Sequence, residues 1–176
     1  MIMQSKQSEA NAVIAVAELM TAAARTAPKT KGQDYLQTCI LTGDDLQRLA
    51  AAMEDIAQEY GHAFISRDAK NVQSSAAVVA LGISHNVRGL NEACGFCKSK
   101  NCAQCVSDNN SCVYDPIDLG IAVGSAVSVA NAHHIDNRVM FSVGLGLKKL
   151  GVFDASVEMV LGIPLCVSGK SPFFDR

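Results

Sequence analysis

Five of the seven cysteines of this 176-residue chain are concentrated in one short segment. They are Cys94, Cys97, Cys102, Cys105 and Cys112, with the spacing C-x2-C-x4-C-x2-C-x6-C. Thiolates on a Gly- and Asn-rich backbone can converge on a metal centre, whereas cysteines dispersed through a packed core cannot. The spacing therefore predicts a metal-binding loop, which is the main indication of function in the sequence.

Two metal centres are compatible with this spacing. The first three cysteines followed by the more remote Cys112 match the way a [4Fe-4S] cluster is held, with three ligands from one loop and a fourth from a returning segment. Alternatively Cys105 supplies the fourth ligand, because the chain then has two C-x2-C knuckles, the usual pattern for tetrahedral zinc. The short interval between the knuckles is unusual for zinc, so we expect an iron–sulfur cluster first, zinc as the alternative metal, and redox-active thiols last.

The composition indicates the setting of this loop. A chain of 176 residues can bury a sufficient hydrophobic core without disulfides or a metal, so the cysteines are not expected to be needed for the stability of the fold. Glu9 and Glu18 interrupt the N-terminal apolar stretch, which argues against a signal peptide, and no apolar run is long enough to span a membrane. We therefore expect a cytoplasmic, reducing environment, where clustered cysteines are more often metal ligands than disulfides.

The charge pattern excludes one class of partner. The formal net charge is −2, and no basic, aromatic-rich patch is present. A nucleic-acid-binding surface should be basic, so nucleic acid is not an expected partner.

The apolar periodicity predicts the elements that must position the loop. Helices are predicted over residues 8–24, from about 46 to just before Gly61, from Asp115-Pro116 to about His133 with Asp115 as the cap, and over 147–150. Strands are predicted over residues 35–41, 76–83, 138–143 and 157–163. Because no repeat or linker is visible, we expect one α+β domain over residues 1–176, in which residues 89–115 form a Cys-rich cluster-binding insertion.

Two features outside the loop suggest close packing. Gly120, Gly124 and Ser128 form a small-residue stripe on a predicted helix, which is expected to pack tightly in the core or between subunits rather than to bind a cofactor. Phe173-Phe174, near the C-terminus, is expected to dock into a dimer groove, since it would otherwise be exposed aromatic surface.

Six segments together carry a resemblance to a known family, and they are AARTAPKTKG, ISRDAKNV, the cysteine segment, IDLGIAVGSAV, DNRVMFSVG and GIPLCVSGKSPFFDR. With them the chain resembles, over nearly its whole length, an uncharacterised prokaryotic family whose members contain a ferredoxin domain. The family's cysteine segment is similar to four-iron–four-sulfur domains with a CGxCGxxxC core and a distal fourth cysteine. This implies Cys94, Cys97, Cys102 and Cys112 as ligands. The interval to Cys112 is shorter than in many such domains, and Cys105 stays an alternative fourth ligand.

A second resemblance concerns the body of the chain. The stretch AARTAPKTKGQDYLQTCILTGDDLQRLAAAM is similar to the start of FMN-dependent nitroreductases, and the later "LGIP" and basic C-terminus fit the same order. The resemblance implies a nitroreductase-like sandwich, with a mainly antiparallel sheet flanked by helices, that dimerises and holds FMN between subunits. Where nitroreductases place an Asn and a Gln, this chain has Gly32 and Asp34. The implied flavin-phosphate contacts are Arg25, Lys29, Lys31, Lys170 and Arg176.

The first three of these cations have an alternative interpretation, because they follow a predicted helix and would complement the negative end of its dipole. No acid–base constellation is recognisable, so the catalytic residues are unknown. The sequence predicts an iron–sulfur redox protein that transfers electrons to or from a flavin or a partner. It is a candidate oxidoreductase that depends on a flavin, a [4Fe-4S] cluster or both, and it is expected to be a homodimer. The alternative from another functional class is a non-catalytic binding module stabilised by structural zinc.

Overall fold

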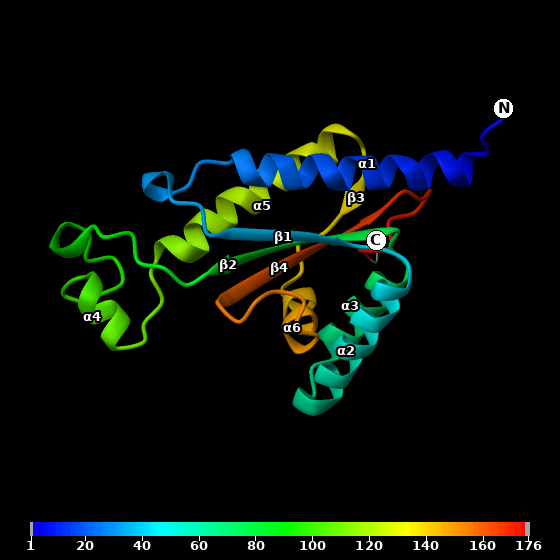
Figure 1. Cartoon of the computed structure of the whole chain (residues 1–176). Helices are drawn as coiled ribbons and strands as arrows, with labels where there is room; N and C mark the ends of the chain where they lie inside the picture. The colour runs from blue at the N-terminus through cyan, green and yellow to red at the C-terminus, as the bar shows by residue number, and fades with distance from the viewer. Residues whose placement is uncertain (1, 175–176) are drawn as a thin grey trace.

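The computed structural model describes residues 2–174 and contains a four-stranded antiparallel sheet with helices on both faces (Figure 1). The strand order is β1-β2-β4-β3. The strands are β1 (Leu36–Leu41), β2 (Ala77–Ser84), β3 (Asp136–Asn137) and β4 (Val157–Cys166). The predicted antiparallel sheet flanked by helices is therefore confirmed.

The central strand β2 explains why its sequence is apolar at nearly every position. All of its residues are buried. Val79 and Leu81 belong to the core cluster on one face of the sheet, whereas Val78 and Ala80 belong to the cluster on the other face. Successive side chains point to opposite faces of a strand, so a strand covered on both faces needs apolar residues throughout. The strand predicted over residues 76–83 is confirmed.

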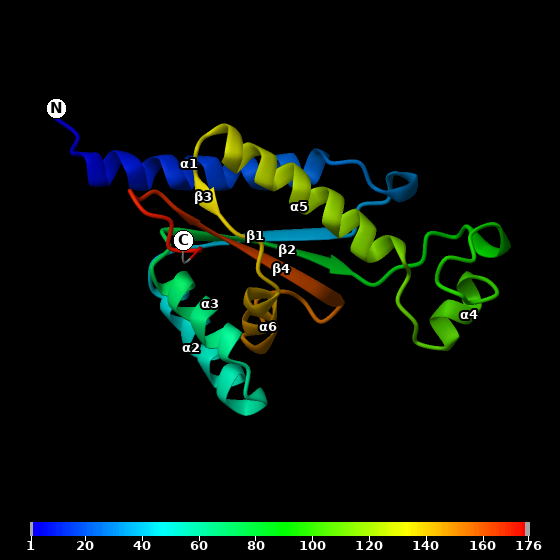
Figure 2. The same cartoon turned by 180° about the vertical axis from the view of Figure 1, so that it is seen from behind.

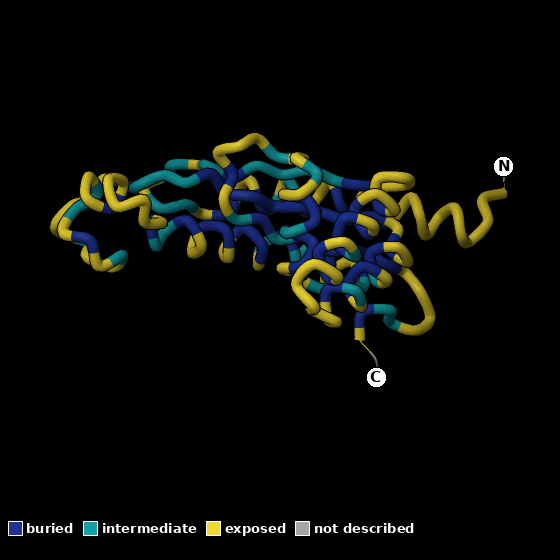
Figure 3. Tube along the Cα trace, turned by 90° about the horizontal axis from the view of Figure 1, so that it is seen from below, coloured by how far each residue is buried: buried dark blue, intermediate teal, exposed yellow. Residues whose placement is uncertain are grey.

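Two helical layers cover the sheet. Helices α1 (Ser5–Thr26) and α5 (Tyr114–Ala132) lie over one face, and α2 (Asp44–Tyr60), α3 (Ala63–Gln73) and α6 (Phe141–Lys149) lie over the other (Figure 2). Small, fully buried side chains such as Ala17, Ala122 and Ala126 let α1 and α5 approach closely. Buried residues gather along the sheet, while the first turns of α1 extend beyond it (Figure 3).

Glycines allow α6 to lie directly against β4. A Cβ atom on Gly144 would overlap the carbonyl oxygen of Val160, and one on Gly162 would overlap the Val143 side chain. Any larger residue at either position would require the helix and the strand to separate. These close approaches hold α6 against the sheet face that carries Val78 and Ala80, here named the second core cluster.

The structure corrects several predicted elements. Residues 138–143 do not form a strand, because only Met140 bridges to Gly162 before α6 begins at Phe141. The glycines described above make helical packing available to a segment whose β-branched and aromatic residues indicate a strand. The predicted helix over 147–150 is the end of α6, and α3 was not predicted. Helix α5 starts at Tyr114, so Asp115 lies inside the helix rather than at its cap.

Candidate metal centre

The cysteines lie where the chain leaves the sheet. After β2 ends at Ser84, residues 89–113, here named the cysteine loop, project beyond the end of the sheet before α5 returns (Figure 1). The loop contains the 3-10 helix η2 (Asn91–Ala93) and the short helix α4 (Cys102–Ser107). It is therefore positioned by two rigid elements, β2 before it and α5 after it.

All five predicted cysteines line one cavity. Cys105 and Cys112 are buried, whereas Cys94, Cys97 and Cys102 are partly exposed, and none of them forms a disulfide. Gly95, Ser99 and Tyr114 are among the other residues that line the cavity, and the ring of Phe96 lies 6.2 Å from that of Tyr114. The sequence prediction that these thiols converge agrees with this geometry.

The backbone of the loop explains the convergence. Positive φ angles reverse the chain repeatedly, and they occur at Gly89, Asn91, Gly95, Lys98 and Asn109. Glycine adopts this region without a steric penalty, and asparagine tolerates it better than most residues. The Asn101 side chain accepts a hydrogen bond from the N–H of Gln104 (2.9 Å) and caps α4. Residues three apart share a helix face, so α4 directs Cys102 and Cys105 to the same side.

Hydrogen bonds connect the thiols to each other and to the loop backbone. The Asn91 N–H donates to Cys102 Sγ (3.3 Å), and the Cys105 thiol donates to the carbonyl oxygen of Asn110 (3.2 Å). Hydrogen bonds from Ser99, first from its backbone, lower the pKa of Cys97. Burial, followed by the neighbouring Cys97, raises the pKa of Cys105 to about 11. N–H donors directed at sulfur are one of the features that tune iron–sulfur centres.

The chemistry of the donor set is that of an iron–sulfur site. Within residues 2–174, no group of three His, Cys, Asp or Glu side chains is arranged so that it could hold a metal ion. The space among the thiols is about 20 Å³, roughly that of one water, so the loop must widen around a four-iron cluster. In such a cluster each cysteine binds a different iron, so the thiols surround a volume rather than a point. The chemistry of five thiols therefore fits iron–sulfur ligation, and the geometry gives no support to zinc.

A buried ion-pair network, which the sequence analysis missed, attaches the loop to the body. The Arg88 side chain is 1% exposed, and its guanidinium lies 2.9 Å from Asp115 Oδ1 and 2.9 Å from Asp118 Oδ2. It also donates to the carbonyl oxygen of Asn86 and lies 4.8 Å from the ring centroid of Tyr35. The two aspartates are the only charged residues of α5, whose other residues are mostly apolar. Two carboxylates on such a helix are the sequence feature that could have indicated a buried ion pair.

Each aspartate has a second set of partners. Asp118 Oδ1 accepts hydrogen bonds from the backbone N–H (3.0 Å) and the hydroxyl (2.8 Å) of Thr30. Asp115 Oδ2 lies 3.2 Å from Nδ1 of His85, which supplies the acid partner that His85 lacked in the sequence. Burial raises the pKa of Asp115, although the Asn86 N–H and Arg88 oppose that shift. The network therefore connects the segment after β2, helix α5 and the turn after α1 at the base of the cysteine loop.

Two of the proposed flavin contacts, Lys29 and Arg25, form hydrogen bonds within their own chain. Lys29 Nζ donates to the carbonyl oxygens of Ala24, Arg25 and Ala27 at 2.7–2.8 Å, so it caps the end of α1, as the alternative interpretation proposes. Burial lowers the pKa of Lys29. Arg25 donates to Asp34 Oδ2 (2.6 Å) and to the carbonyl oxygen of Leu36 (2.8 Å). Asp34, which departs from the nitroreductase pattern, is thus the partner of Arg25.

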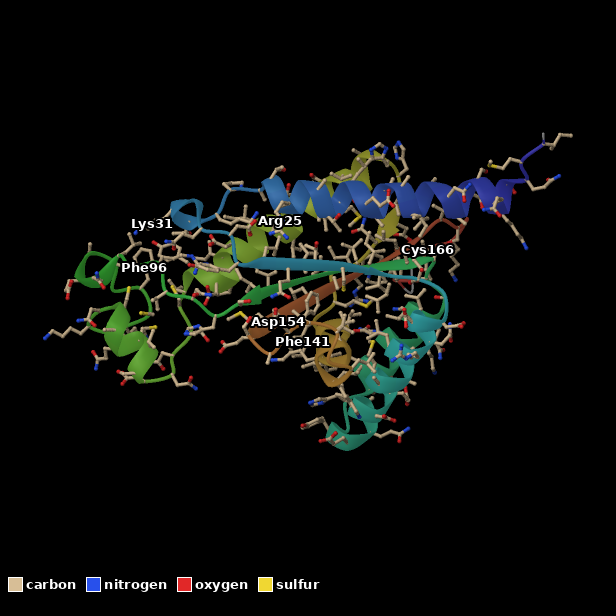
Figure 4. The ribbon with its side chains drawn as sticks, viewed as in Figure 1. Arg25, Lys31, Phe96, Phe141, Asp154 and Cys166 are labelled. Atoms are coloured by element: carbon tan, nitrogen blue, oxygen red, sulfur yellow. The ribbon has the colours of Figure 1, made fainter. Side chains whose placement is uncertain are left out.

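Lys31 and Lys170, the other candidate cations within the described residues, lie far from each other. Lys31 is exposed, has a positive φ of 58°, and lies between Arg25 and the cysteine loop (Figure 4). Lys170 is exposed in the segment after β4, at the opposite end of the sheet from the loop (Figure 1). Arg176 lies outside the described residues. Within residues 2–174, one chain therefore does not bring the four described cations together into a single phosphate site.

The structure bears on two packing predictions. Gly120 and Gly124 lie on the exposed face of α5, where an added Cβ would meet no atom within 4 Å, so the stripe does not pack in the core of this chain, and its packing between subunits stays a prediction. Ile117 and Ile121 on the same face are also exposed. Phe173 is 2% exposed within the second core cluster of its own chain, rather than in a dimer groove.

Among the helices of residues 2–174, none is long and apolar enough to cross a membrane.

Comparison with known protein families supports the interpretation of the C-terminal part of the chain. Residues 108–176, which include Cys112, match the family described as uncharacterized proteins containing a ferredoxin domain. An uncharacterized protein from Archaeoglobus fulgidus is 40% identical over 183 residues, covering 100% of this chain and 98% of that protein. The predicted resemblance to a ferredoxin-domain family is thereby confirmed.

Solved structures identify the fold. A nitroreductase with bound FMN from Desulfitobacterium hafniense has a TM-score of 0.60 and 12% identity, covering 97% of this chain and 81% of its own. The FMN and NADPH-dependent nitroreductase NfnB from Sphigopyxis sp. strain HMH has a TM-score of 0.61 and 11% identity, covering 90% and 81%. At these identities the similarity establishes the fold alone, and it confirms the predicted nitroreductase-like α+β architecture.

Proposed function

The chain belongs to the family of uncharacterised proteins that contain a ferredoxin domain, and from this premise we propose that it is an iron–sulfur redox protein. In this proposal a [4Fe-4S] cluster on the cysteine loop passes single electrons to or from a flavin or a partner protein. The observation that carries the proposal is the convergence of five thiols on one cavity at the end of a rigid strand. Electron transfer requires proximity and a tuned potential, so it needs no acid–base constellation.

The proposed ligands are Cys94, Cys97, Cys102 and Cys112, with Cys105 as the alternative fourth ligand. When bound, the cluster would supply reversible one-electron chemistry. The protein would hold it through these thiolates, donate the Asn91 N–H to sulfur, and cover it in part with Phe96 and Tyr114. We further propose that residues 1–176 form one domain with residues 89–115 as its cluster-binding insertion, since the loop leaves and rejoins the body at β2 and α5.

A flavin is the second cofactor that we propose. The solved nitroreductases of the same fold include one with bound FMN and one described as FMN-dependent, which motivates FMN on this body. The exposed Lys31 is the favoured phosphate contact, because Arg25 and Lys29 are already hydrogen-bonded to groups of their own chain.

The proposed oligomer is a homodimer. Lys170 would contribute to the flavin site only from a second chain, and the exposed apolar face of α5 is the surface that we assign to the dimer. We place the protein in the cytoplasm, where its thiols would stay reduced.

The test is the absorption spectrum of protein purified without oxygen, combined with iron, zinc and acid-labile sulfide analysis. We expect broad visible absorbance and about four irons and four sulfides per chain. Cys97→Ser should remove most of the iron and the colour, whereas Cys39→Ser, on β1, should retain both and serves as the matched control. Unchanged iron content in Cys97→Ser would contradict the proposed ligands, and colourless protein with one zinc per chain would instead support a binding module.

A further inference from the structure

We propose that Arg88 tunes the reduction potential of the centre held by the cysteine loop, by placing a buried positive charge beside it. The inference rests on the proposed iron–sulfur function and adds a residue that controls it. Arg88 is one position before the loop, and its side chain is 1% exposed. It lines the same cavity as the five cysteines. A fixed cation therefore stands at the protein-side wall of the proposed site.

The burial of this guanidinium requires a compensating structure. An unpaired buried charge is strongly unfavourable, so a buried arginine persists only with charged and hydrogen-bonding partners. Asp115 and Asp118 provide two carboxylates from the first turns of α5, and Asn86 provides a carbonyl oxygen. Asp118 is in turn fixed by both hydrogen-bond donors of Thr30. The network holds the cation in one orientation.

The position of the charges decides the sign of their effect. Arg88 lines the cavity, whereas Asp115 and Asp118 do not, so the cation is the one charged residue other than the cysteines among the lining residues. Reduction moves one electron from an external donor onto a centre that its thiolates already make anionic, and no bond or proton changes in this step. A nearby cation stabilises the added negative charge, and at low local dielectric this stabilisation is large. Arg88 should raise the potential, while the carboxylates behind it moderate that increase.

A purely structural role makes a different prediction. If the network only attached the loop to the body, removing either charge would lower the stability of the protein and would leave the potential without a systematic response. Charge tuning instead predicts opposite signs. Arg88→Gln should lower the potential, because the cation is lost, and Asp118→Asn should raise it, because Arg88 is then less compensated.

The experiment is an anaerobic dithionite titration of the cluster-loaded full-length protein, followed by absorbance and electron paramagnetic resonance. Arg88→Gln, Arg88→Lys, Asp118→Asn and the distant Arg138→Gln are compared with the wild type at equal iron and sulfide content. We expect a lower potential for Arg88→Gln, a higher one for Asp118→Asn, a smaller change for Arg88→Lys, and no change for Arg138→Gln. Arg138 is a suitable control because its guanidinium contacts the C-terminal segment, where it donates to the carbonyl oxygen of Phe173.

Shifts of the same sign in Arg88→Gln and Asp118→Asn, or no shift in either, would overturn the inference while leaving the cluster established. If Arg88→Gln does not fold, Asp118→Asn decides the matter, since an unchanged or lower potential there contradicts charge tuning. Absence of any iron–sulfur cluster in the wild type would be a different result, because it refutes the proposed function itself.

Discussion

The sheet with its helices and the cysteine loop are built on different physical principles. In the body, apolar side chains are buried on both faces of β2, and glycines let α6 contact β4 directly. In the loop, three of the five cysteines are partly exposed, the chain turns at five positive-φ residues, and buried apolar side chains are few. The body is held by packing, whereas the loop is held by polar contacts and a buried ion-pair network.

This difference implies a division of roles. A tightly packed region loses stability when a side chain changes even slightly in volume. A loop with few packed contacts can change its conformation at low cost in free energy. The cysteines can therefore adjust to a metal centre without disturbing the sheet. The network around Arg88 is the point at which the two regions are mechanically and electrostatically connected.

The largest expected effect comes from a methyl group added to the body. In Gly144→Ala the new Cβ would overlap the Val160 carbonyl oxygen, so backbone must move, and we expect a loss of about 3 kcal/mol or more in the free energy of unfolding. Gly120→Ala is the matched control, because its Cβ meets open space on a helix, and it should stabilise by up to about 1 kcal/mol. Urea unfolding measures both, and equal stabilities would contradict the packing described for α6.

The second prediction concerns the loop alone. Cys112→Ser should lose most of the cluster iron, while Cys105→Ser should retain it, if Cys112 is the fourth ligand. Both residues are buried in the loop, so the pair is matched for environment. Iron analysis and visible absorbance measure the outcome, and circular dichroism should show an unchanged body in both variants. The reverse pattern of iron loss would assign the fourth position to Cys105.

A smaller effect is expected where the two regions join. Thr30→Val removes the hydroxyl that donates to the buried Asp118, and it should cost about 1–2 kcal/mol, since a buried carboxylate loses a partner. Thr26→Val is the control, because the hydroxyl of this exposed residue bonds only to the carbonyl oxygen of Ala23 in its own helix. Chemical denaturation compares the two, and a cost in Thr30→Val no larger than in the control would show that the network adds little stability.

The smallest effect is a pH dependence of the body. Burial raises the pKa of Cys39 from 9.0 to about 11, so the folded state keeps a proton that the unfolded chain releases. This contribution is complete below pH 9 and is lost as the pH rises to about 11. Because the thiol is partly exposed, we expect only about 1 kcal/mol. The stability of Cys39→Ala should fall less than that of the wild type over this interval, and parallel curves would contradict the shift.

Much of the fold follows from local patterns. The apolar periodicity of α1 and α5 and the apolar run of β2 were predicted nearly to their ends, because these elements bury whole faces. Residues 138–143 were misassigned, since their β-branched and aromatic residues favour a strand in isolation, while Gly144 and Gly162 permit the close contact that favours a helix. Local propensity is weak enough for such packing to override it.

Some features of the candidate site also follow from the sequence, and others follow only from the tertiary structure. The sequence by itself determined that five thiols share one short segment, because the covalent chain fixes their spacing. Their convergence on one cavity depends on the turns at the positive-φ residues and on helix α4. Only the tertiary structure decided that Lys29 caps α1, that Arg25 pairs with Asp34, and that Arg88 meets Asp118. Arg88 and Asp118 are thirty residues apart, and their pairing depends on how β2 and α5 meet. Proximity along the chain is fixed by covalent geometry, whereas contacts between distant residues are fixed by the packing of the elements that carry them.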